Sequence, residues 1–308
     1  MAIRSAIEWT EATWNPVTGC EPVSLGCAHC YAARMAKRLA GRCGYPARPN
    51  EFAVTLHPDR LDDPFRWRKP RLVFVCSMGD LFHEDVPFLS IATVWQIMSI
   101  AHQHTYQVLT KRPDRMLEFF DWGRGRFPWC TDSILPNAWL GVTAENQEQA
   151  NKRIPVLLHV PAAVRFVSVE PMLGEMDLNP YFPGYGASCD SKLDWVICGG
   201  ETGPGARPMH PQWVRFLREQ CQGADMPFFF KAWGDWCPES HTELFTTDNS
   251  MRWGVLTRDG EFYENITPWN GRNEISPDYE AIMYRIGKKA AGRLLDGRIW
   301  DEFPGRLE

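Results

Sequence analysis

Three cysteines lie close together near the amino end of the chain, in the stretch WNPVTGCEPVSLGCAHCYAAR (residues 14–34). Six residues separate Cys20 from Cys27, and two separate Cys27 from Cys30. A C-x-x-C pair allows two thiolates to reach one metal centre, and the neighbouring Gly and Pro residues allow the backbone to fold around it. The spacing therefore predicts a metal or redox site on this loop.

Three kinds of centre are compatible with the pattern. A structural zinc site requires four ligands, so Cys43 or His57 would have to add the fourth. A redox pair of thioredoxin type would leave Cys20 without a role. A [4Fe–4S] cluster with three protein thiolates would leave its fourth iron open for a small-molecule ligand. We favour the cluster because the loop follows the first strand of a predicted βα series.

The bulk composition excludes several classes of protein. The 308 residues carry a net charge of −5 without a block of Lys or Arg, which argues against strong non-specific binding to nucleic acid. Apolar runs such as MPFFFKAW (residues 226–233) are far shorter than the roughly 18–20 residues of a membrane span. The amino end has no apolar segment of signal-peptide length. We therefore expect a cytoplasmic protein with no membrane partner.

In that compartment the ten cysteines are not expected to form a disulfide framework. Outside the cysteine-rich loop and Cys43, they are scattered, several of them in apolar segments where cysteine behaves as a small hydrophobe. We expect these six to be structural: Cys76, Cys130, Cys189, Cys198, Cys221 and Cys237.

From about residue 70 the chain alternates between short apolar runs and helix-like stretches. The runs are continuous rather than alternating, which is typical of parallel strands buried on both faces. They cover residues 71–80, 105–112, 138–146, 164–171, 193–201 and 227–234, and the helices cover 87–104, 113–120, 146–160 and 209–222. With a first strand near residues 8–18, this predicts an α/β fold, a partial (β/α) TIM-like barrel of six to seven parallel strands over residues 1–240.

Residues 241–308 do not show this alternation and are predicted to form a small C-terminal extension packed on the barrel. Asp259-Gly260 lies between two strand-like arms in residues 252–266, which predicts a hairpin. Residues 278–304 are predicted to form a helix that ends at Gly297.

Polar residues follow the predicted strands at the point where each strand ends. In a parallel barrel these ends share one face, which carries the active site. The residues are Asp80, Lys111, Arg112, Glu145, Asn146, Glu170, Glu201 and Lys231. Alternatively, Lys111-Arg112 is a solvated loop, and Glu145 caps a helix. The basic residues, with Arg207, either bind phosphates or pair with Glu145, Glu170 and Glu201.

The segment GGETGPG (residues 199–205) is the most distinctive of these strand ends. Its glycines permit close approach of the backbone to a ligand, as in phosphate or carboxylate cradles. It is not a Walker loop, because no Lys-Ser/Thr follows at the required spacing.

The motifs together resemble those of a known family. WNPVTGCEPVSLGCAHCYA, FVCSMGDLFH, LTKRP, LGVTAEN, SVEPMLG, WVICGGETGPGARPM, FFFKAWG and IGKKAAGRLLDG are similar to a phage-associated three-cysteine family that is described as radical S-adenosylmethionine (SAM)-like. The resemblance covers about residues 8 to 304. A more distant similarity is to spore photoproduct lyase, a radical enzyme that acts on thymine in DNA.

The resemblance implies that Cys20, Cys27 and Cys30 hold a [4Fe–4S] cluster whose open iron binds SAM. An electron from a flavodoxin- or ferredoxin-type donor would cleave SAM to a 5′-deoxyadenosyl radical that abstracts hydrogen from a substrate. The implied substrate is a modified pyrimidine base in DNA or a nucleotide, which would be rearranged or isomerised. The wider superfamily usually has the spacing C-x3-C-x2-C, and the six-residue gap between Cys20 and Cys27 departs from it. A phage-encoded protein would act in the host cytoplasm.

The resemblance also assigns roles to other positions. His29 and Tyr31 flank the third cysteine, and His29 would lie against the adenine of SAM. The remaining implied SAM-binding residues are Ser77, Met78, Asp80, Thr143, Gly199 and Gly200, with Ser77 and Asp80 on the amino group. The implied catalytic or substrate-contacting residues are Lys111, Glu145, Glu170 and Glu201.

Two other functions remain open at this point. One is a radical SAM enzyme that acts on a peptide or protein, in which extra cysteines bind an auxiliary cluster. The other is a zinc-binding module that recognises nucleic acid without catalysis.

Overall fold

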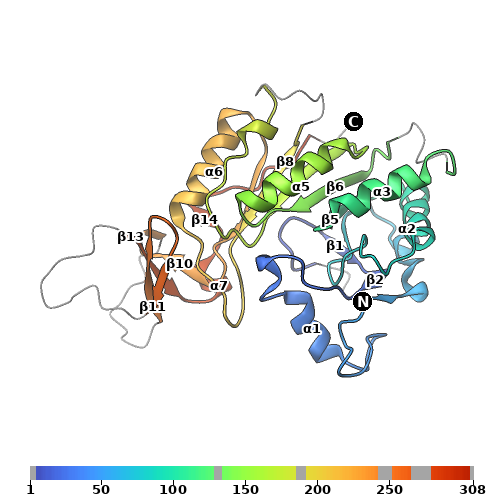
Figure 1. Ribbon diagram of the computed structural model, residues 1–308, viewed down its shortest axis with the longest axis horizontal. Helices are drawn as coiled ribbons and strands as arrows, with labels where there is room; N and C mark the ends of the chain where they lie inside the picture. The colour runs from blue at the N-terminus through green and yellow to red at the C-terminus, as the bar shows by residue number, and fades with distance from the viewer. Residues whose placement is uncertain (1–4, 128–133, 185–191, 242–251, 265–278, 306–308) are drawn as a thin grey trace, which may run out of the picture.

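The computed structural model (Figure 1) describes residues 5–127, 134–184, 192–241, 252–264 and 279–305. Its main element is a sheet of seven strands in which every neighbouring pair is parallel. In sheet order the strands are β1 (Ala12–Trp14), β4 (Leu72–Val75), β5 (Thr105–Thr110), β6 (Ala138–Thr143), β7 (Val164–Val169), β8 (Trp195–Gly199) and β9 (Phe228–Ala232). The sheet curls into a half-barrel, which confirms the predicted α/β partial barrel.

Four helices connect the strands and cover the outer face of the sheet, as Figure 1 shows. They are α2 (Phe88–Ile100), α3 (Pro113–Gly123), α5 (Gln147–His159) and α6 (Pro211–Gly223), and each confirms a predicted helix. Three of them begin at or beside a proline, where a helix tolerates the missing N–H: Pro87 is the N-cap of α2, and Pro113 and Pro211 lie in the first turns of α3 and α6.

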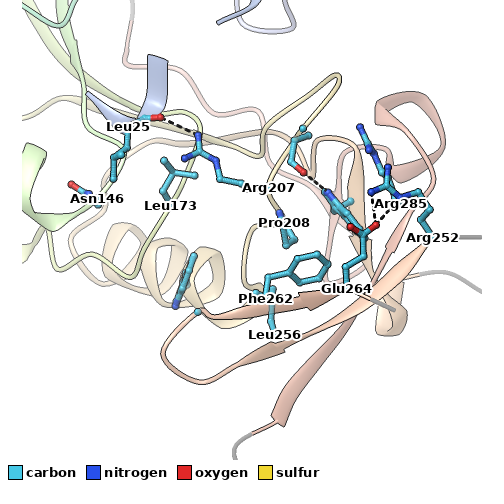
Figure 2. Close-up of a pocket in the computed structure, with 15 residues that line it drawn as sticks. Leu25, Asn146, Leu173, Arg207, Pro208, Arg252, Leu256, Phe262, Glu264 and Arg285 are labelled. Carbon is cyan, nitrogen blue, oxygen red and sulfur yellow. Dashed lines mark hydrogen bonds and ion pairs between the residues drawn. The ribbon is translucent and has the colours of Figure 1, made fainter. Parts of the chain in front are cut away.

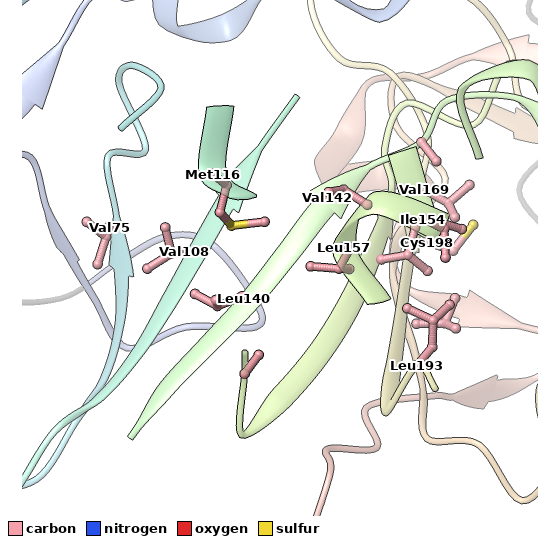
Figure 3. Close-up of a cluster of buried hydrophobic side chains, with 14 of the residues drawn as sticks. Val75, Val108, Met116, Leu140, Val142, Ile154, Leu157, Val169, Leu193 and Cys198 are labelled. Carbon is pink, nitrogen blue, oxygen red and sulfur yellow. The ribbon is translucent and has the colours of Figure 1, made fainter. Parts of the chain in front are cut away.

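The main hydrophobic core lies between these helices and the sheet. In Figure 3 the strand residues Val108 and Leu140 lie near Met116 of α3 and Leu157 of α5. Cys76, Cys198, Cys221 and Cys237 are buried, which confirms their structural role, whereas Cys130 and Cys189 lie outside the described residues. All eight described cysteines are free thiols.

A second cluster fills the inner face of the half-barrel at the amino ends of the strands. It is built from large rings and is here called the aromatic floor: Trp9, Trp139, Phe166, Trp195 and Phe229. All five are buried, and the ring centroids of Trp195 lie 5.6 Å from Phe166 and 5.9 Å from Trp139. These aromatic contacts close the amino end of the interior.

The same inner face becomes polar toward the carboxyl ends of the strands. Side chains alternate between the two faces of a strand, so every second residue after a floor residue also points inward. Counting in twos leads from Phe166 to Glu170 and from Phe229 to Lys231. The strands therefore place charged side chains above the aromatic floor.

The C-terminal part forms a second, antiparallel sheet of four strands. Its order is β10 (Trp236–Pro238), β13 (Tyr279–Arg285), β11 (Trp253–Thr257) and β12 (Phe262–Glu264). The pairing of β11 with β12 confirms the predicted hairpin around Asp259-Gly260. β10 precedes the predicted boundary at residue 240, although it pairs within this second sheet.

The helix predicted over residues 278–304 is wrong. Its first part is β13, which pairs on both sides with β10 and β11. Helix α7 (Lys288–Ala291) has four residues, because Gly287 and Gly292 flank it with φ values of 81° and 69° that a right-handed helix does not allow. The short strands β14 (Leu294–Leu295) and β15 (Arg298–Ile299) follow.

The first strand is shorter than predicted, because β1 is followed by a separate two-stranded sheet. In this sheet β2 (Val17–Thr18) pairs with β3 (Thr55–Leu56), and α1 (Tyr31–Leu39) lies between them in the chain. The 3₁₀ helices are η1 (Leu25–Cys27), η2 (Pro58–Arg60), η3 (Asp63–Arg66), η4 (Asn179–Tyr181) and η5 (Glu239–His241). No helix within the described ranges has both the length and the apolar character needed to cross a membrane.

Candidate functional site

The three cysteines lie on the segment from Cys20 to Cys30, here called the cysteine loop, which leads from β2 into α1. Its start is fixed to the end of β4, because the Gly19 amide donates to the Met78 carbonyl at 2.9 Å and Gly19 forms a parallel bridge with Gly79. All three thiols are partly exposed. The loop therefore begins at the carboxyl end of the parallel sheet.

Glu145, which follows β6, anchors the middle of the cysteine loop. Its carboxylate is 1% exposed, pairs with Lys111 and Arg153, and accepts a hydrogen bond from Ser24 Oγ at 2.6 Å. Lys111 Nζ also lies 3.5 Å from Cys27 Sγ. The charge of Lys111 is thus shared between a buried carboxylate and the second thiol of the loop.

Arg112 has a comparable position beside the first thiol. Its Nη1 lies 3.3 Å from both Cys20 Sγ and Asp80 Oδ2, and its Nε donates to Glu84 at 3.0 Å. Both Arg112 and Asp80 are buried. Lys111 and Arg112 are therefore not a solvated loop, since both reach sulfur atoms of the cysteine loop.

Asp80 is occupied by protein donors. Its oxygens accept hydrogen bonds from Thr110 Oγ1 at 2.7 Å, from the backbone amides of Phe82 at 3.0 Å and Lys111 at 3.2 Å, and from Arg112. A carboxylate with four such donors is well satisfied. In this structure Asp80 positions Arg112 next to Cys20, and its predicted contact with the amino group of SAM would have to displace one of these donors.

The two thiols differ in acidity. Burial, together with the charge of Asp80, raises the pKa of Cys20 to about 11 despite the proximity of Arg112. Burial also acts to raise the pKa of Cys27, but the charge of Lys111 and hydrogen bonds from Val23 and Ser24 outweigh it and lower this pKa. Because the thiolate is the metal-binding form, Cys27 is the better prepared ligand of the two.

Glu201, which follows β8, holds the other side of the cysteine loop. It accepts hydrogen bonds from Arg207 Nη2 at 2.7 Å, from Arg207 Nε at 2.9 Å and from His29 Nδ1 at 3.0 Å. Arg207 Nη2 also donates to the Leu25 carbonyl at 3.1 Å. Burial acts to raise the pKa of Glu201, but the bonds from Arg207 and His29 lower it overall, so the carboxylate stays ionised.

A third ion pair joins Lys231 of β9 to Glu170 at the end of β7. These side chains are 16% and 24% exposed, more than Glu145. A side chain at Gly199, between them on β8, would come within 3.3 Å of Lys231 Cβ and 3.6 Å of Glu170 Cδ. Together with the pairs Lys111–Glu145 and Arg207–Glu201, this confirms for three of the four basic residues that they pair with these glutamates. The fourth, Arg112, pairs with Asp80 and Glu84 instead.

The glycine-rich segment 199–205 is packed by the protein's own atoms. The Trp233 carbonyl occupies the place of a side chain at Gly200, and the Arg34 guanidinium does so at Gly203. At Gly205 a side chain would lie 2.7 Å from His29 Nε2. At these three positions the glycines allow close packing within the chain, which differs from the predicted open cradle for a ligand.

The remaining predicted cofactor residues occupy separate places around the strand ends. Ser77 Oγ and the Met78 amide both donate to Asn15 Oδ1, at 3.2 and 3.0 Å. Thr143 is buried at the end of β6, and Tyr31 is 59% exposed at the start of α1. The structure thus brings Ser77 and Met78 together at Asn15 and leaves Tyr31 facing outward.

Helix α5 is not capped by Glu145. The side chain of Asn146 accepts a hydrogen bond from the Gln149 amide at 3.0 Å, so Asn146 is the N-cap. Glu145 is thereby free to point toward Lys111 and Ser24.

Among the contacts of the described residues, neither candidate for a fourth zinc ligand reaches the cysteine loop. His57 is buried and lies 2.7 Å from Thr18 Oγ1 through Nε2, and Cys43 is exposed. Within the part of the chain that the structure describes, no three His, Cys, Asp or Glu side chains are arranged to hold one metal ion.

Two contributors to the site were missed in the sequence. Arg153 lies on α5 and reaches back to Glu145 at 2.9 Å, and no motif marks it. Ser24 lies three residues before Cys27 and contacts Glu145; its place between two cysteines was the only available signal.

The comparisons with known proteins give one family and a few distant structures. A family model with the description "Protein of unknown function (DUF5131)" matches residues 4–304. No curated protein is a significant match. A cysteine-to-serine mutant of spore photoproduct lyase is 12% identical, with a TM-score of 0.41, and the alignment covers 86% of this chain and 71% of that chain.

A double mutant of spore photoproduct lyase with bound AdoMet and dinucleoside spore photoproduct is 11% identical, with a TM-score of 0.39 and coverage of 82% of this chain and 68% of that chain. A tyrosine-to-phenylalanine mutant is 11% identical, with a TM-score of 0.38 and coverage of 85% and 72%. These TM-scores are too low to support an argument about fold or function, so the architecture rests on the strand order alone.

Proposed function

Because the chain belongs to the family described as "Protein of unknown function (DUF5131)", which assigns no activity, we propose from the site itself that it is a radical SAM enzyme. In this proposal Cys20, Cys27 and Cys30 hold a [4Fe–4S] cluster. The observation that carries it is the placement of a three-cysteine loop across the carboxyl ends of a parallel half-barrel, with Lys111 and Arg112 reaching two of the sulfurs.

The donor set fits such a cluster in type and place. A cluster of this kind binds each thiolate through a different iron, so it requires three thiols on one loop rather than four ligands around one ion. A zinc site would need a fourth ligand, and His57 is already buried against Thr18. The donor set therefore favours a cluster over a zinc module.

The residues around the thiols have definite roles in this proposal. When bound, the cluster and SAM would supply the reductive cleavage of SAM to methionine and a 5′-deoxyadenosyl radical, which takes a hydrogen atom from the substrate. Lys111 and Arg112 place positive charge and N–H donors at Cys27 and Cys20, and hydrogen bonds to ligand sulfurs raise a cluster's reduction potential. The aromatic floor excludes water from the amino end of the interior.

The remaining assignments are part of the same proposal. His29, Ser77, Met78, Thr143 and Gly199 would contact SAM, and Glu170 and Lys231 would face the reacting groups. The electron donor would be a flavodoxin- or ferredoxin-type protein. The substrate would be a modified pyrimidine in DNA or in a nucleotide, rearranged after hydrogen abstraction.

The test is anaerobic reconstitution with iron and sulfide, followed by addition of SAM and dithionite. The wild type should bind about four irons per chain, as one [4Fe–4S] cluster requires, and release 5′-deoxyadenosine. Cys27→Ala should lose the cluster absorbance and the product, whereas Cys43→Ala, an exposed cysteine outside the loop, should retain both.

Two results would exclude the proposal. One is a colourless protein that binds zinc and no iron under these conditions. The other is 5′-deoxyadenosine formation at the wild-type rate in Cys27→Ala. An iron content near eight per chain would instead indicate a second cluster and favour the alternative of a peptide-modifying enzyme.

A further inference from the structure

A cavity of about 460 Å³ lies between the cysteine loop and the second sheet (Figure 2). One side is formed by Leu25 of the cysteine loop, Asn146, Leu173 and residues 205–208, which follow β6, β7 and β8. The other side is formed by side chains of the second sheet and by Trp213 of α6. Its size is within the range of small-molecule sites.

The second sheet and α6 give the cavity an aromatic wall. Phe262 and Trp236 pack with ring centroids 4.8 Å apart at an interplanar angle of 72°. Trp236 is held by a hydrogen bond from Nε1 to the Ala206 carbonyl at 2.6 Å. A side chain at Gly260 would collide with Trp213, so the hairpin turn rests directly on this ring. Trp213 and Trp236 are buried, whereas Phe262 is partly exposed. The ring of Phe262, supported from behind by Trp236, is therefore the surface on which a flat ligand can stack.

The same lining contains three arginines, Arg207, Arg252 and Arg285. Each is paired with one carboxylate, Glu201, Glu264 and Asp235 respectively. Arg252 pairs with Glu264 and is 55% exposed, so it can turn toward a ligand. Arg285 donates to the Gly203 carbonyl at 2.7 Å, which orients its guanidinium. Arginines in such an arrangement bind phosphate oxygens.

We propose that this cavity binds a nucleotide, with the base against Phe262 and the phosphate at Arg252 and Arg285. The nucleotide is either free or part of a nucleic acid strand, because both present the same base and phosphate. Leu25 and Arg207 connect the cavity to the cysteine loop, so the occupant would be the substrate. This last step, and only this step, rests on the proposed function.

Binding can be measured by calorimetry on the protein without a cluster, with thymidine 5′-monophosphate as the probe. The wild type should bind it at least about tenfold more tightly than thymidine, since a charge-assisted phosphate contact contributes about that factor. Arg252→Gln should remove this difference while leaving thymidine binding unchanged. Phe262→Leu should weaken the binding of both thymidine and its monophosphate.

The matched control is Arg258→Gln. Arg258 lies on the same hairpin and pairs with Glu280 at 2.6 Å, and it does not line the cavity. The affinity of the Arg258→Gln variant for thymidine 5′-monophosphate should equal that of the wild type. Thermal melting of each variant checks that it is folded. A thymine-containing oligonucleotide that binds more tightly than the mononucleotide, with the same dependence on Arg252, would identify a strand as the source.

The proposal is overturned if the wild type binds thymidine and its monophosphate equally, or binds neither. It is also overturned if Arg258→Gln loses as much affinity as Arg252→Gln, or if SAM displaces the nucleotide in competition. If the wild type binds the nucleotide but assembles no cluster on anaerobic reconstitution, the proposed function is rejected and the cavity assignment stands.

Discussion

The two ends of the half-barrel interior use the same alternating positions of the strands but differ in chemistry. At the amino end the aromatic floor is almost entirely rings, whose contacts fill volume. At the carboxyl end the positions carry charges, here called the ionic mouth: Lys111, Glu145, Glu170, Glu201 and Lys231. The comparison indicates that stability and chemistry are divided along each strand, with packing at one end and attachment of the cysteine loop at the other.

The ionic mouth is itself uneven. Glu145 and Arg153 are 1% and 3% exposed, whereas Glu170 and Lys231 are 24% and 16% exposed. Breaking a buried pair leaves an uncompensated charge, whereas partly exposed pairs contribute little. Glu145 should therefore matter for stability as well as for the site, and Glu170 mainly for the site.

The largest effect should come from the aromatic floor. Trp195 contacts four other rings of the inner face and donates from Nε1 to the Glu302 carbonyl at 2.8 Å. Trp195→Ala should lower the free energy of unfolding by about 3–5 kcal/mol, measured by urea denaturation. Trp195→Phe should lower the free energy of unfolding less, because most of the ring volume remains. An equal decrease in the two variants would contradict a packing role.

A smaller effect is expected in the ionic mouth. Glu145→Gln should cost about 3 kcal/mol, because it leaves Arg153 buried without its counter-ion. Glu170→Gln should cost less than about 1 kcal/mol and yet reduce 5′-deoxyadenosine formation at least about tenfold if Glu170 faces the reacting groups. Denaturation and product assays on the same two variants separate these effects. Equal losses of stability would remove the distinction between the two carboxylates.

The smallest effect concerns pH. The pKa of Glu201 is lowered in the folded protein, since the bonds from Arg207 and His29 outweigh burial. A carboxyl group with a depressed folded pKa stabilises the protein above its unfolded pKa, and this contribution is lost as pH falls through the folded value. The stability difference between wild type and Glu201→Gln should therefore be largest near neutral pH and shrink below about pH 4.5. A difference that stays constant to pH 3 would show that ionisation of Glu201 is not the cause.

Much of the half-barrel could be predicted because its strands are continuous apolar runs and its helices lie between them. The C-terminal helix could not, since the segment that forms β13 reads equally well as a helix until its partners β10 and β11 are known. Strand pairing over long sequence distances decided the outcome there.

Within the site, residue types and strand ends predicted the cysteine loop and the glutamates that face it. Partners drawn from helices were not predictable: Arg153 comes from α5, eight positions after Glu145, and Arg34 comes from α1. The roles of Gly200, Gly203 and Gly205 were also hidden, because a glycine that makes room for Trp233, Arg34 or His29 looks the same in the sequence as one that makes room for a ligand.

Arg207 belongs both to the wall of the cavity and to the attachment of the cysteine loop, because it contacts Glu201 and the Leu25 carbonyl. A ligand that binds this guanidinium competes with its hydrogen bonds to Glu201 and to the Leu25 carbonyl. By thermodynamic reciprocity, any arrangement of the loop that releases Arg207 must then change the affinity of that ligand by the same factor. One side chain is thus sufficient to make the occupancy of the cavity and the geometry around the thiols dependent on each other.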